Sequence, residues 1–568
     1  MITKNMKTVL YSCILVFSSS ITFTSCSDML DTNSELVEFE KDNTLNHPTD
    51  SVYSVMGIVN RMQLIADRVN LLGEVRGDLV TTTEAASADL KRLAAFDFSQ
   101  ENKYNQVSDY YAVINNCNYY LTHVDTLLER RGRKLFTYEY AAVKAFRAWT
   151  YLELVKAYGR VPLVVNPVMT EVEAREAMNG EQMDITAICN YFIADLTPYA
   201  QVELPQFGNI NGMDSRSFFI PMRALLGDLC LWANRYEEAA RWYNDYLNDR
   251  YEPIRMNFSG RTQWMNVSFQ RPSVGYYVSS NEMLSYIPME DRVFDGTVSD
   301  LQNIYESTQE NNYYFQLTPS ANMRRLSADQ IYCVEYKTDT QTDTVYAPRS
   351  GFSDDLLIGD LRLYSNFSQI SIGGQDAYSE YSSLSQTINK IMSSRITTYR
   401  RSMVYLRYAE ALNRAGLPQS AMVVLKNGIC QENIRNCVDS LERVKAGSLI
   451  NFDATTFTRQ TTIGVHSLGS GDSECNAYYT LPQPTTPLGT RQDTINYQIP
   501  LVEDLIINEM ALEGSFEGYR YYDLLRVALR RNDPAYLADP ISLRTGVQDA
   551  GLRALLMDPK NWYLPIER

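Results

Sequence analysis

The sequence predicts a mostly α-helical protein in which tetratricopeptide-like helical hairpins form a scaffold around a large irregular insertion. Helical spacing is clearest over residues 138–158, where one face carries Ala142, Ala145, Phe146, Trp149 and Leu152. Paired helical segments recur at 221–247, 403–429 and 501–530, spread along the chain instead of in tandem. Residues 251–400 are rich in Ser, Asn, Gly and Tyr and show few helical stripes, so they form the insertion, with short strands suggested near 331–336.

The ends of these helices carry recognisable signals. Asp50 is a good N-cap for a helix that follows it, and Gly159 with Pro162 predicts the end of the helix at 138–158. Helical spacing also covers 109–128. Asn234-Arg235 separates two helices at 221–233 and 237–247, and a second irregular stretch covers 451–500. Because binding residues concentrate on loops held by a rigid frame, the insertion is where we expect a ligand site.

The first 26 residues have the layout of an export signal. Lys4 and Lys7 precede an apolar stretch, residues 9–23, which ends at Thr24-Ser25-Cys26. That stretch is too short to cross a bilayer. A Cys at the cut site indicates a lipoprotein, with Cys26 acylated and holding the protein to a membrane. We therefore expect a signal peptide at 1–25, a lipidated leash at 26–48 and a single domain at 49–568; the alternative is an ordinary secretory signal with an incidental Cys.

The charge balance argues against nucleic acid as a partner. The chain has a net charge of −16, and loss of the two lysines of the signal makes it −18. Such a field repels nucleic acid and anionic lipid surfaces. It is compatible with a neutral or cationic ligand, or with solubility alone.

Seven of the nine cysteines remain after Cys13 and Cys26 are set aside. Cys189 and Cys230 lie in apolar helical patterns and are predicted core residues. Cys430 and Cys437 are close enough in sequence to pair in an oxidising compartment, and whether they do stays open. There is no C-x-x-C pair and there are only three histidines, which does not favour a zinc site. We expect no cofactor; the sequence does not decide whether calcium supports a loop.

Five segments, in order, resemble one known family. They are AAVKAFRAWTYLELVKAYGRVPLV (141–164), ALLGDLCLWANRYEEAARWYNDYL (224–247), YLRYAEALNRAG (405–416), EMALEGSFEGYRYYDLLR (509–526) and WYLPIER (562–568). Together with CSDMLD after the cut site, they resemble the SusD/RagB family of Bacteroidota outer-membrane lipoproteins over nearly the whole mature chain. One departure is Val107, at a place where the family often has Trp, so that ring is missing here.

The resemblance implies a fold and a role that composition does not. It implies a SusD-like fold and a cell-surface, outer-membrane location, as the hinged lid of a SusC-type TonB-dependent barrel. Its ligands would be nutrient oligomers, most often oligosaccharides, and no covalent chemistry would be performed. Two alternatives remain: the same lid role for oligopeptides, and a surface-tethered polysaccharide hydrolase.

Two groups of residues are candidate ligand contacts. The first is Arg76 and Asp78 in the loop at 73–84, where a planar donor fork and a carboxylate suit sugar hydroxyls or a peptide carboxylate. The alternative is an Arg–carboxylate contact that fixes the loop. The second group is aromatic and amide residues of the insertion: Trp264, Tyr286, Asn312, Tyr313 and Tyr314. Their alternative is a loop or sheet core, although the consecutive aromatics at 313–315 cannot all face inward in an extended segment.

The acids of the last hairpin are predicted to be structural. Glu509 and Glu513 share a helix face, and Arg520 and Asp523 follow. A glycosidase needs two acids lining a cleft, and nothing in the sequence supports that geometry. The chain also lacks G-x-S-x-G, the phosphate-binding G-x-x-x-x-G-K-[ST] and H-E-x-x-H. We therefore expect a binding protein and not an enzyme.

Overall fold

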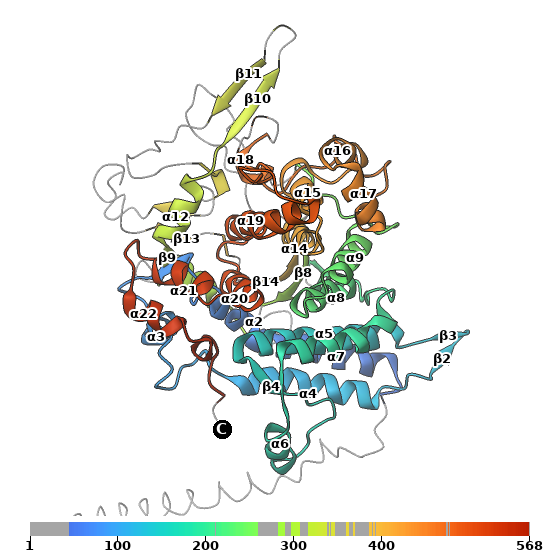
Figure 1. Cartoon of the computed structure of the whole chain (residues 1–568). Coiled ribbons are helices and arrows are strands. Elements are labelled where there is room, and N and C mark those ends of the chain that lie inside the picture. Colours follow the sequence, from blue (N-terminus) through green and yellow to red (C-terminus); the bar gives the residue numbers. More distant parts are fainter. Residues whose placement is uncertain are drawn as a thin grey trace, which may run out of the picture. The chain divides into compact units, whose positions relative to one another are not determined.

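The computed structural model, shown in Figure 1, describes residues 45–566. Within that range it leaves out 211, 259–281, 290–296, 307–315, 338–339, 341, 347–358, 363–366, 370–385, 389, 392–393, 473–474 and 476–477. None of the helices in the described part is long and apolar enough to cross a bilayer. Cys26, Trp264, Asn312, Tyr313 and Tyr314 lie outside the described residues.

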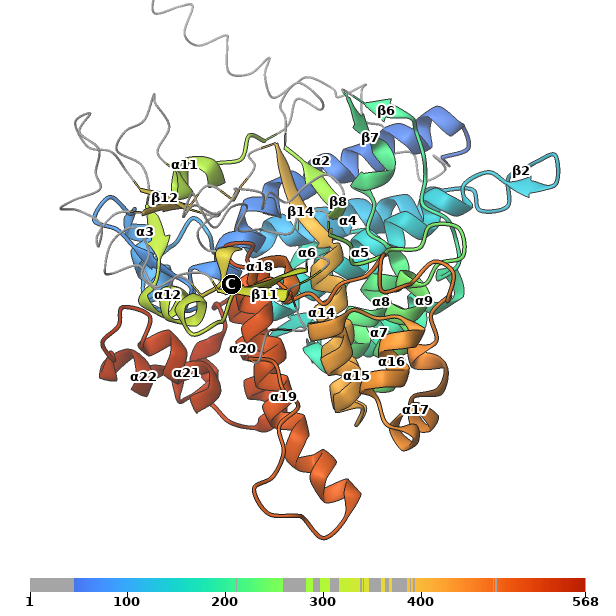
Figure 2. The same cartoon turned by 90° about the horizontal axis from the view of Figure 1, so that it is seen from above.

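A series of mostly long helices forms the scaffold, in which each helix contacts others of the series. They are α2 (Pro48–Glu74), α4 (Val107–His123), α5 (Thr137–Tyr158), α7 (Ile185–Leu196), α8 (Met222–Trp232), α9 (Tyr236–Leu247), α14 (Arg401–Arg414), α15 (Pro418–Met422), α19 (Arg491–Glu513) and α20 (Arg520–Arg531). Contacts run from α4 through α5, α7, α8 and α9 to α14, which also contacts α15 and α19. The series then continues from α19 to α20, and α20 returns to contact α2. Figure 2 shows α14 and α15 beside the α8–α9 pair, with α2, α4 and α5 behind them.

Several predicted helix ends match those observed, and others differ. The helix expected over 109–128 ends at His123, and the one expected to reach residue 429 ends as an α-helix at Met422. The first helix begins at Pro48 and not at Asp50, because Pro is favoured at the first position of a helix and His47 caps it. Helix α19 begins at Arg491, ten residues before the predicted start at Leu501, because Thr490 and Asp493 form a capping box. The end of α5 at Gly159 and the α8–α9 hairpin around Asn234 are confirmed.

Strands are short and form two-stranded antiparallel ribbons. The pairs are β1 (Val80–Thr82) with β9 (Leu317–Pro319), β8 (Met283–Pro288) with β14 (Arg395–Arg400), β10 (Cys333–Lys337) with β11 (Thr342–Tyr346), β12 (Phe367–Gln369) with β13 (Gln386–Ile388), β2 (Glu129–Arg130) with β3 (Arg133–Lys134), β4 (Arg160–Pro162) with β5 (Gln182–Asp184), and β6 (Asn209–Ile210) with β7 (Met213–Asp214). Short helices fill the connections: α3 (Ala88–Ala94), α6 (Glu171–Met178), α11 (Leu301–Tyr305), α12 (Ala321–Ala328), α16 (Gln431–Cys437), α17 (Ser440–Ala446), α18 (Ser467–Ser470), α21 (Ala535–Ser542) and α22 (Ala550–Leu556). The expected class, mostly α with a short-strand insertion, is confirmed.

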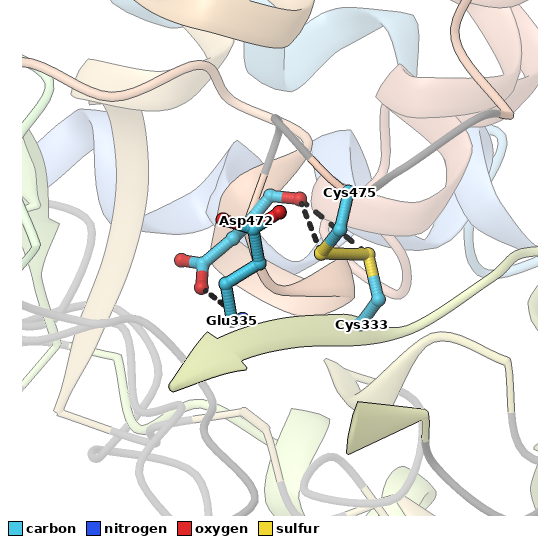
Figure 3. Close-up of a disulfide and its surroundings, with 4 residues drawn as sticks. All are labelled: Cys333, Glu335, Asp472 and Cys475. Carbon is cyan, nitrogen blue, oxygen red and sulfur yellow. Dashed lines mark hydrogen bonds between the residues drawn. A yellow bond between two sulfur atoms is a disulfide. The ribbon is translucent and has the colours of Figure 1, made fainter. Parts of the chain in front are cut away.

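A disulfide joins the insertion to the scaffold. Cys333, at the start of β10, is bonded to Cys475, which is 142 residues later (Figure 3). The Asp472 amide donates to the Cys333 carbonyl (2.7 Å), and the Glu335 amide donates to the Asp472 carboxylate (2.9 Å). The backbone approaches so closely here that a Cβ on Gly471, at φ +89°, would lie 1.9 Å from the Cys333 carbonyl oxygen.

The other described cysteines are free thiols. Cys189 and Cys230 are buried among core residues, as predicted. Cys430 and Cys437 do not pair: Cys430 is buried and its sulfur accepts from the Asn433 amide at the start of α16, whereas Cys437 is exposed.

Glu74, at the end of α2, is an uncompensated acid in the core. It is fully buried, and burial raises its pKa from 4.5 to about 8, although the Gly518 amide donates to it (3.1 Å). The folded state therefore holds more protons than the unfolded state between pH 4.5 and about 8. The free energy of unfolding must fall as the pH rises through that window.

Replacing Glu74 with Gln should remove this part of the pH dependence. Relative to the parent protein, we expect Glu74→Gln to gain little at pH 5 and on the order of 3–4 kcal/mol at pH 8, with any cost of the buried amide constant with pH. Urea unfolding at pH 5, 6.5 and 8 measures the difference, and the exposed Glu84→Gln is the control. A stability difference that does not change with pH would show that Glu74 is ionised in the folded protein.

Candidate functional site

A hollow of about 910 Å³ opens where five parts of the scaffold meet. These parts are the end of α5 with β4, the start of α7, the end of α8, the end of α20, and the C-terminal segment 559–565. Phe96 and Phe98, in the connection between α3 and α4, complete the lining. Figure 1 shows the C-terminal segment (dark red) passing beside β4. The volume of the hollow and its mixture of apolar and polar lining residues are typical of a small-molecule site.

Five aromatic side chains line the hollow. Tyr158, Phe96 and Trp232 are buried, whereas Phe98 and Tyr563 are half-buried and have ring surface that a ligand can reach. The rings of Phe96 and Phe98 meet edge to face, with their centroids 6.3 Å apart. Aromatic rings offer large flat apolar surfaces at a small cost in conformational entropy. These rings form the apolar floor of the hollow, which is therefore suited to the apolar face of a flat ligand ring.

The C-terminal segment is fixed firmly against α5 and α20. The Trp562 carbonyl accepts from Arg76 (3.1 Å) and from the Tyr521 hydroxyl, and the Trp562 indole donates to the Leu556 carbonyl (2.7 Å). The Leu564 amide then donates to the carbonyl of Ala157, in the last turn of α5 (3.0 Å). These bonds on both sides of Tyr563 hold its ring at the wall of the hollow.

Gly159 allows Tyr563 to lie directly against the end of α5. It ends the helix at φ +76°, a conformation that favours glycine. A Cβ built on it would lie 2.7 Å from the ring of Tyr563. The helix-stop residue recognised in the sequence thus also shapes the hollow.

Polar groups surround the opening. Arg160, Asp184 and Lys560 are exposed there, and the side chains of Asn234 and Thr186 are exposed beside them. Arg160 lies 3.8 Å from Asp184 and donates to the Gln182 carbonyl (2.5 Å). Asp184 also caps α7 by accepting from the Ala187 amide (2.9 Å). The rim thus holds both hydrogen-bond donors and acceptors around an apolar floor.

Arg76 and Asp78, predicted from sequence as ligand contacts, are internal. Arg76 is 0% exposed; it donates to the carbonyls of Leu72 (2.8 Å) and Trp562, and to the Tyr522 hydroxyl (3.1 Å). Asp78 is 3% exposed and forms an ion pair with Arg520 (2.6 Å). No ligand reaches such groups in this structure. The geometry agrees with the alternative interpretation, in which these two residues fix the loop at 73–84. Arg76 acts on the hollow only by positioning the C-terminal segment.

Tyr286 is also placed in the interior. It lies on β8, 5% exposed, in an apolar cluster with Met213 and Phe218. Its ring meets Phe218 edge to face and has the Arg395 guanidinium 5.2 Å from its centroid. The sheet-core alternative therefore describes this residue, because alternate residues of a strand point to opposite faces and this one points to the core.

The predicted structural role of the acids in the last hairpin is confirmed. Glu509 pairs with Arg362 (2.6 Å) and with His466 (2.8 Å), and Glu513 pairs with Arg362 (2.8 Å) and Arg400 (2.5 Å). Both acids are fully buried. Their carboxylates face cations in the core, which is the arrangement of a structural charge network. Within the described residues, no group of three or more His, Cys, Asp or Glu is placed to hold a metal ion.

The residues that line the hollow were not predicted as site residues. Phe98, Arg160, Lys560 and Tyr563 are isolated in sequence, and nothing in their local pattern indicates that they converge. One signal was available: four of the five segments that carry the family resemblance supply its walls, through Tyr158, Trp232, Arg526 and Tyr563.

Comparison with known proteins places the chain by its fold. No model of a protein family matches it, and no curated protein does. Among solved structures, a SusD superfamily protein from Bacteroides vulgatus ATCC 8482 is similar over 92% of this chain and 96% of its own, at a TM-score of 0.53 and 14% identity. A SusD superfamily protein from Bacteroides thetaiotaomicron VPI-5482 is similar over 88% and 95%, at a TM-score of 0.50 and 16% identity. A Bacteroides vulgatus protein provisionally named as sugar-binding is similar over 85% and 88%, at a TM-score of 0.50 and 16% identity.

These likenesses define the class of the protein: it has the SusD-like fold, as the resemblance in sequence predicted.

Proposed function

We propose that the protein is a cell-surface, outer-membrane lipoprotein that binds oligosaccharides in the hollow formed by α5, α7, α8, α20 and the C-terminal segment. The observation that carries this proposal is the lining: five aromatic side chains under a rim of charged and amide groups. A sugar ring has an apolar face and a belt of hydroxyls. Aromatic rings cover such a face, and rim donors and acceptors satisfy the hydroxyls.

The wider role follows the family resemblance. A similar solved structure is provisionally named as sugar-binding, and others are SusD superfamily proteins. These names support a glycan ligand here. Acylation at Cys26 would hold the protein to the outer membrane, where it acts as the lid of a SusC-type TonB-dependent barrel. The buried ion pairs of Glu509 and Glu513 favour binding without hydrolysis.

Removing the two half-buried rings should weaken glycan binding. We expect the double variant Phe98→Ala, Tyr563→Ala to bind at least about tenfold more weakly, because each ring supplies about 1 kcal/mol or more of stacking and burial. Calorimetry with a panel of oligosaccharides on the mature protein measures the affinity. Tyr138→Ala, at a tyrosine that is 46% exposed and does not line the hollow, is the control.

Unchanged affinity in a double variant that still folds would place the glycan elsewhere, with the aromatics of residues 251–400 as the next candidates. Binding of oligopeptides alone would favour the alternative cargo, and shortening of a polymer by the purified protein would favour the hydrolase.

The lid role has its own test. Gentle affinity purification from the native outer membrane, followed by mass spectrometry, should recover a large barrel protein in stoichiometric amount. Recovery of the protein without a barrel would leave a free surface binder.

A further inference from the structure

Two exposed cations, Arg160 and Lys560, lie at the mouth of the hollow in a strongly acidic protein. The chain has a net charge of −16, yet Arg160, Arg526, Arg530 and Lys560 line this hollow against a single acid, Asp184. The low-dielectric walls of a hollow focus the field of such charges, which raises the local concentration of a ligand of opposite sign.

Two of these cations belong to the scaffold. Arg526 pairs with Glu410 (2.6 Å) and Asp523 (2.9 Å), and Arg530 pairs with Glu503 (2.6 Å) and Glu410. Burial disfavours ionisation of Glu410, but the two guanidinium groups prevail and lower its pKa to about 2. Arg530 is still not fully satisfied: its side chain is 2% exposed, and its Nε has no hydrogen-bond partner among the described residues. Because the side chain is so little exposed, Arg530 acts on a ligand through its charge and not by direct contact.

The other two cations are free to meet a ligand. Lys560 is exposed and forms no ion pair within the described part of the chain. Arg160 donates one hydrogen bond to the Gln182 carbonyl (2.5 Å), but its nearest carboxylate oxygen, on Asp184, is 3.8 Å away and both side chains are more than half exposed. Exposed pairs of this kind contribute little, so a ligand carboxylate can compete for the guanidinium.

The start of α7 adds to the same side of the rim. Ile185 and Thr186, the first residues of this 12-residue helix, line the hollow. The first amides of a helix have no partner within it and carry the positive end of its dipole. Asp184 is the one acid of the lining, and its carboxylate already accepts from the Ala187 amide. The rim is therefore left with more hydrogen-bond donors than acceptors.

From this arrangement we propose that the hollow selects acidic oligosaccharides, whose uronic-acid carboxylates bind Arg160 and Lys560 while the sugar rings lie on Phe98 and Tyr563. The inference rests on the proposed glycan-binding function and specifies its substrate class. The negative net charge of the whole protein does not oppose it, because screening limits distant charges to about 8 Å at physiological salt, whereas the rim cations act in contact.

Matched ligands that differ only in charge provide the test. Oligomers of galacturonate, guluronate and glucuronate-containing glycans are compared with their carboxyl-esterified forms by calorimetry on the mature protein. We expect at least one acid form to bind about tenfold or more tightly than its ester, with the difference shrinking as salt is added. Arg160→Gln with Lys560→Gln should remove most of that preference, because the acid form should lose far more affinity than the ester. The control is Arg130→Gln with Lys134→Gln, an exposed pair on the β2–β3 hairpin that does not line the hollow.

The two proposals fail in different ways. Equal binding of acid and ester, or binding of neutral glycans only, would overturn the acidic preference and leave glycan binding standing. A preference for the acid that survives the Arg160 and Lys560 substitutions would also overturn the inference, because the selecting charges would lie elsewhere. No binding of any glycan, charged or neutral, would refute the proposed function itself.

Discussion

Replacing Arg400 with Met is expected to reduce the free energy of unfolding by about 3–5 kcal/mol, which is a large share of the stability of a typical domain. Arg400 is 0% exposed and pairs with Glu513 (2.5 Å) and Glu517 (2.9 Å). It also donates to the Ser402 hydroxyl (2.8 Å), and Glu282 lies 3.8 Å away. Methionine fills a similar volume but leaves three buried carboxylates without this cation.

Because Arg400 links distant parts of the chain, replacing it should destabilise the whole fold. Arg400 is the last residue of β14, which pairs with β8 of the insertion. It also pairs with Glu513, at the end of α19, and with Glu517, in the connection between α19 and α20. Two parts of the chain that are more than a hundred residues apart are therefore held by one guanidinium. A lysine at this position would keep the charge but lose the fork that contacts two carboxylates, so Arg400→Lys should show an intermediate loss.

Urea unfolding of the purified protein measures the effect, and an exposed arginine supplies the control. Arg241 pairs with Glu237, and their side chains are 60% and 70% exposed, so Arg241→Met should cost less than about 1 kcal/mol. The loss of unfolding free energy in Arg400→Met should also shrink at acidic pH, where the carboxylates that have lost this cation can take up protons. A loss below about 1 kcal/mol at pH 7 would mean that this network does not hold the fold.

Removal of the disulfide is expected to have an effect of similar size. Cys333 and Cys475 are separated by 142 residues, and the loop-entropy relation for such a closure gives about 5 kcal/mol as an upper value. We expect Cys333→Ser with Cys475→Ser to lose at least about 2 kcal/mol. Residues 333–400 of the insertion lie within this loop, so the bond is one of the links between the insertion and the scaffold.

Reducing agent gives an independent route to the same state. Adding it to the parent protein should reproduce most of the loss, whereas the double serine variant should not respond. Cys437→Ser, at an exposed free cysteine, is the control and should change stability little. Detection of Cys333 and Cys475 as free thiols in protein exported to an oxidising compartment would contradict the bond.

The scaffold could be predicted because its signals are local. Helical periodicity with a stop at Gly159 placed α5, and Asn234-Arg235 placed the turn of the α8–α9 hairpin. Glu509 and Glu513 on one helix face were correctly assigned to a charge network. In the first two cases the residues that determine the structure lie within a few turns of one another, whereas the cations that pair with Glu509 and Glu513 come from distant segments.

The site could not be predicted because its residues meet only in three dimensions. Phe98 and Arg160 are 62 residues apart and Tyr563 follows 403 residues after Arg160, and local pattern carries no record of such contacts. Arg76 and Asp78 were misleading for a physical reason: a charged pair in an irregular segment looks the same in sequence whether it faces solvent or fixes a buried loop. The Cys333–Cys475 pairing was not predicted, because 142 residues separate the two cysteines; the one pair considered from spacing, Cys430 with Cys437, was left open and does not form.

The central claim is that an oligosaccharide binds in this hollow, and hydrogen-exchange mass spectrometry with and without a bound glycan tests it most directly. We predict slower exchange in peptides that cover residues 95–98, 158–161, 184–187 and 559–565, which line the hollow, and little change at the β2–β3 hairpin. Protection confined to residues 251–400, with none in those four segments, would contradict the claim and move the site to the insertion.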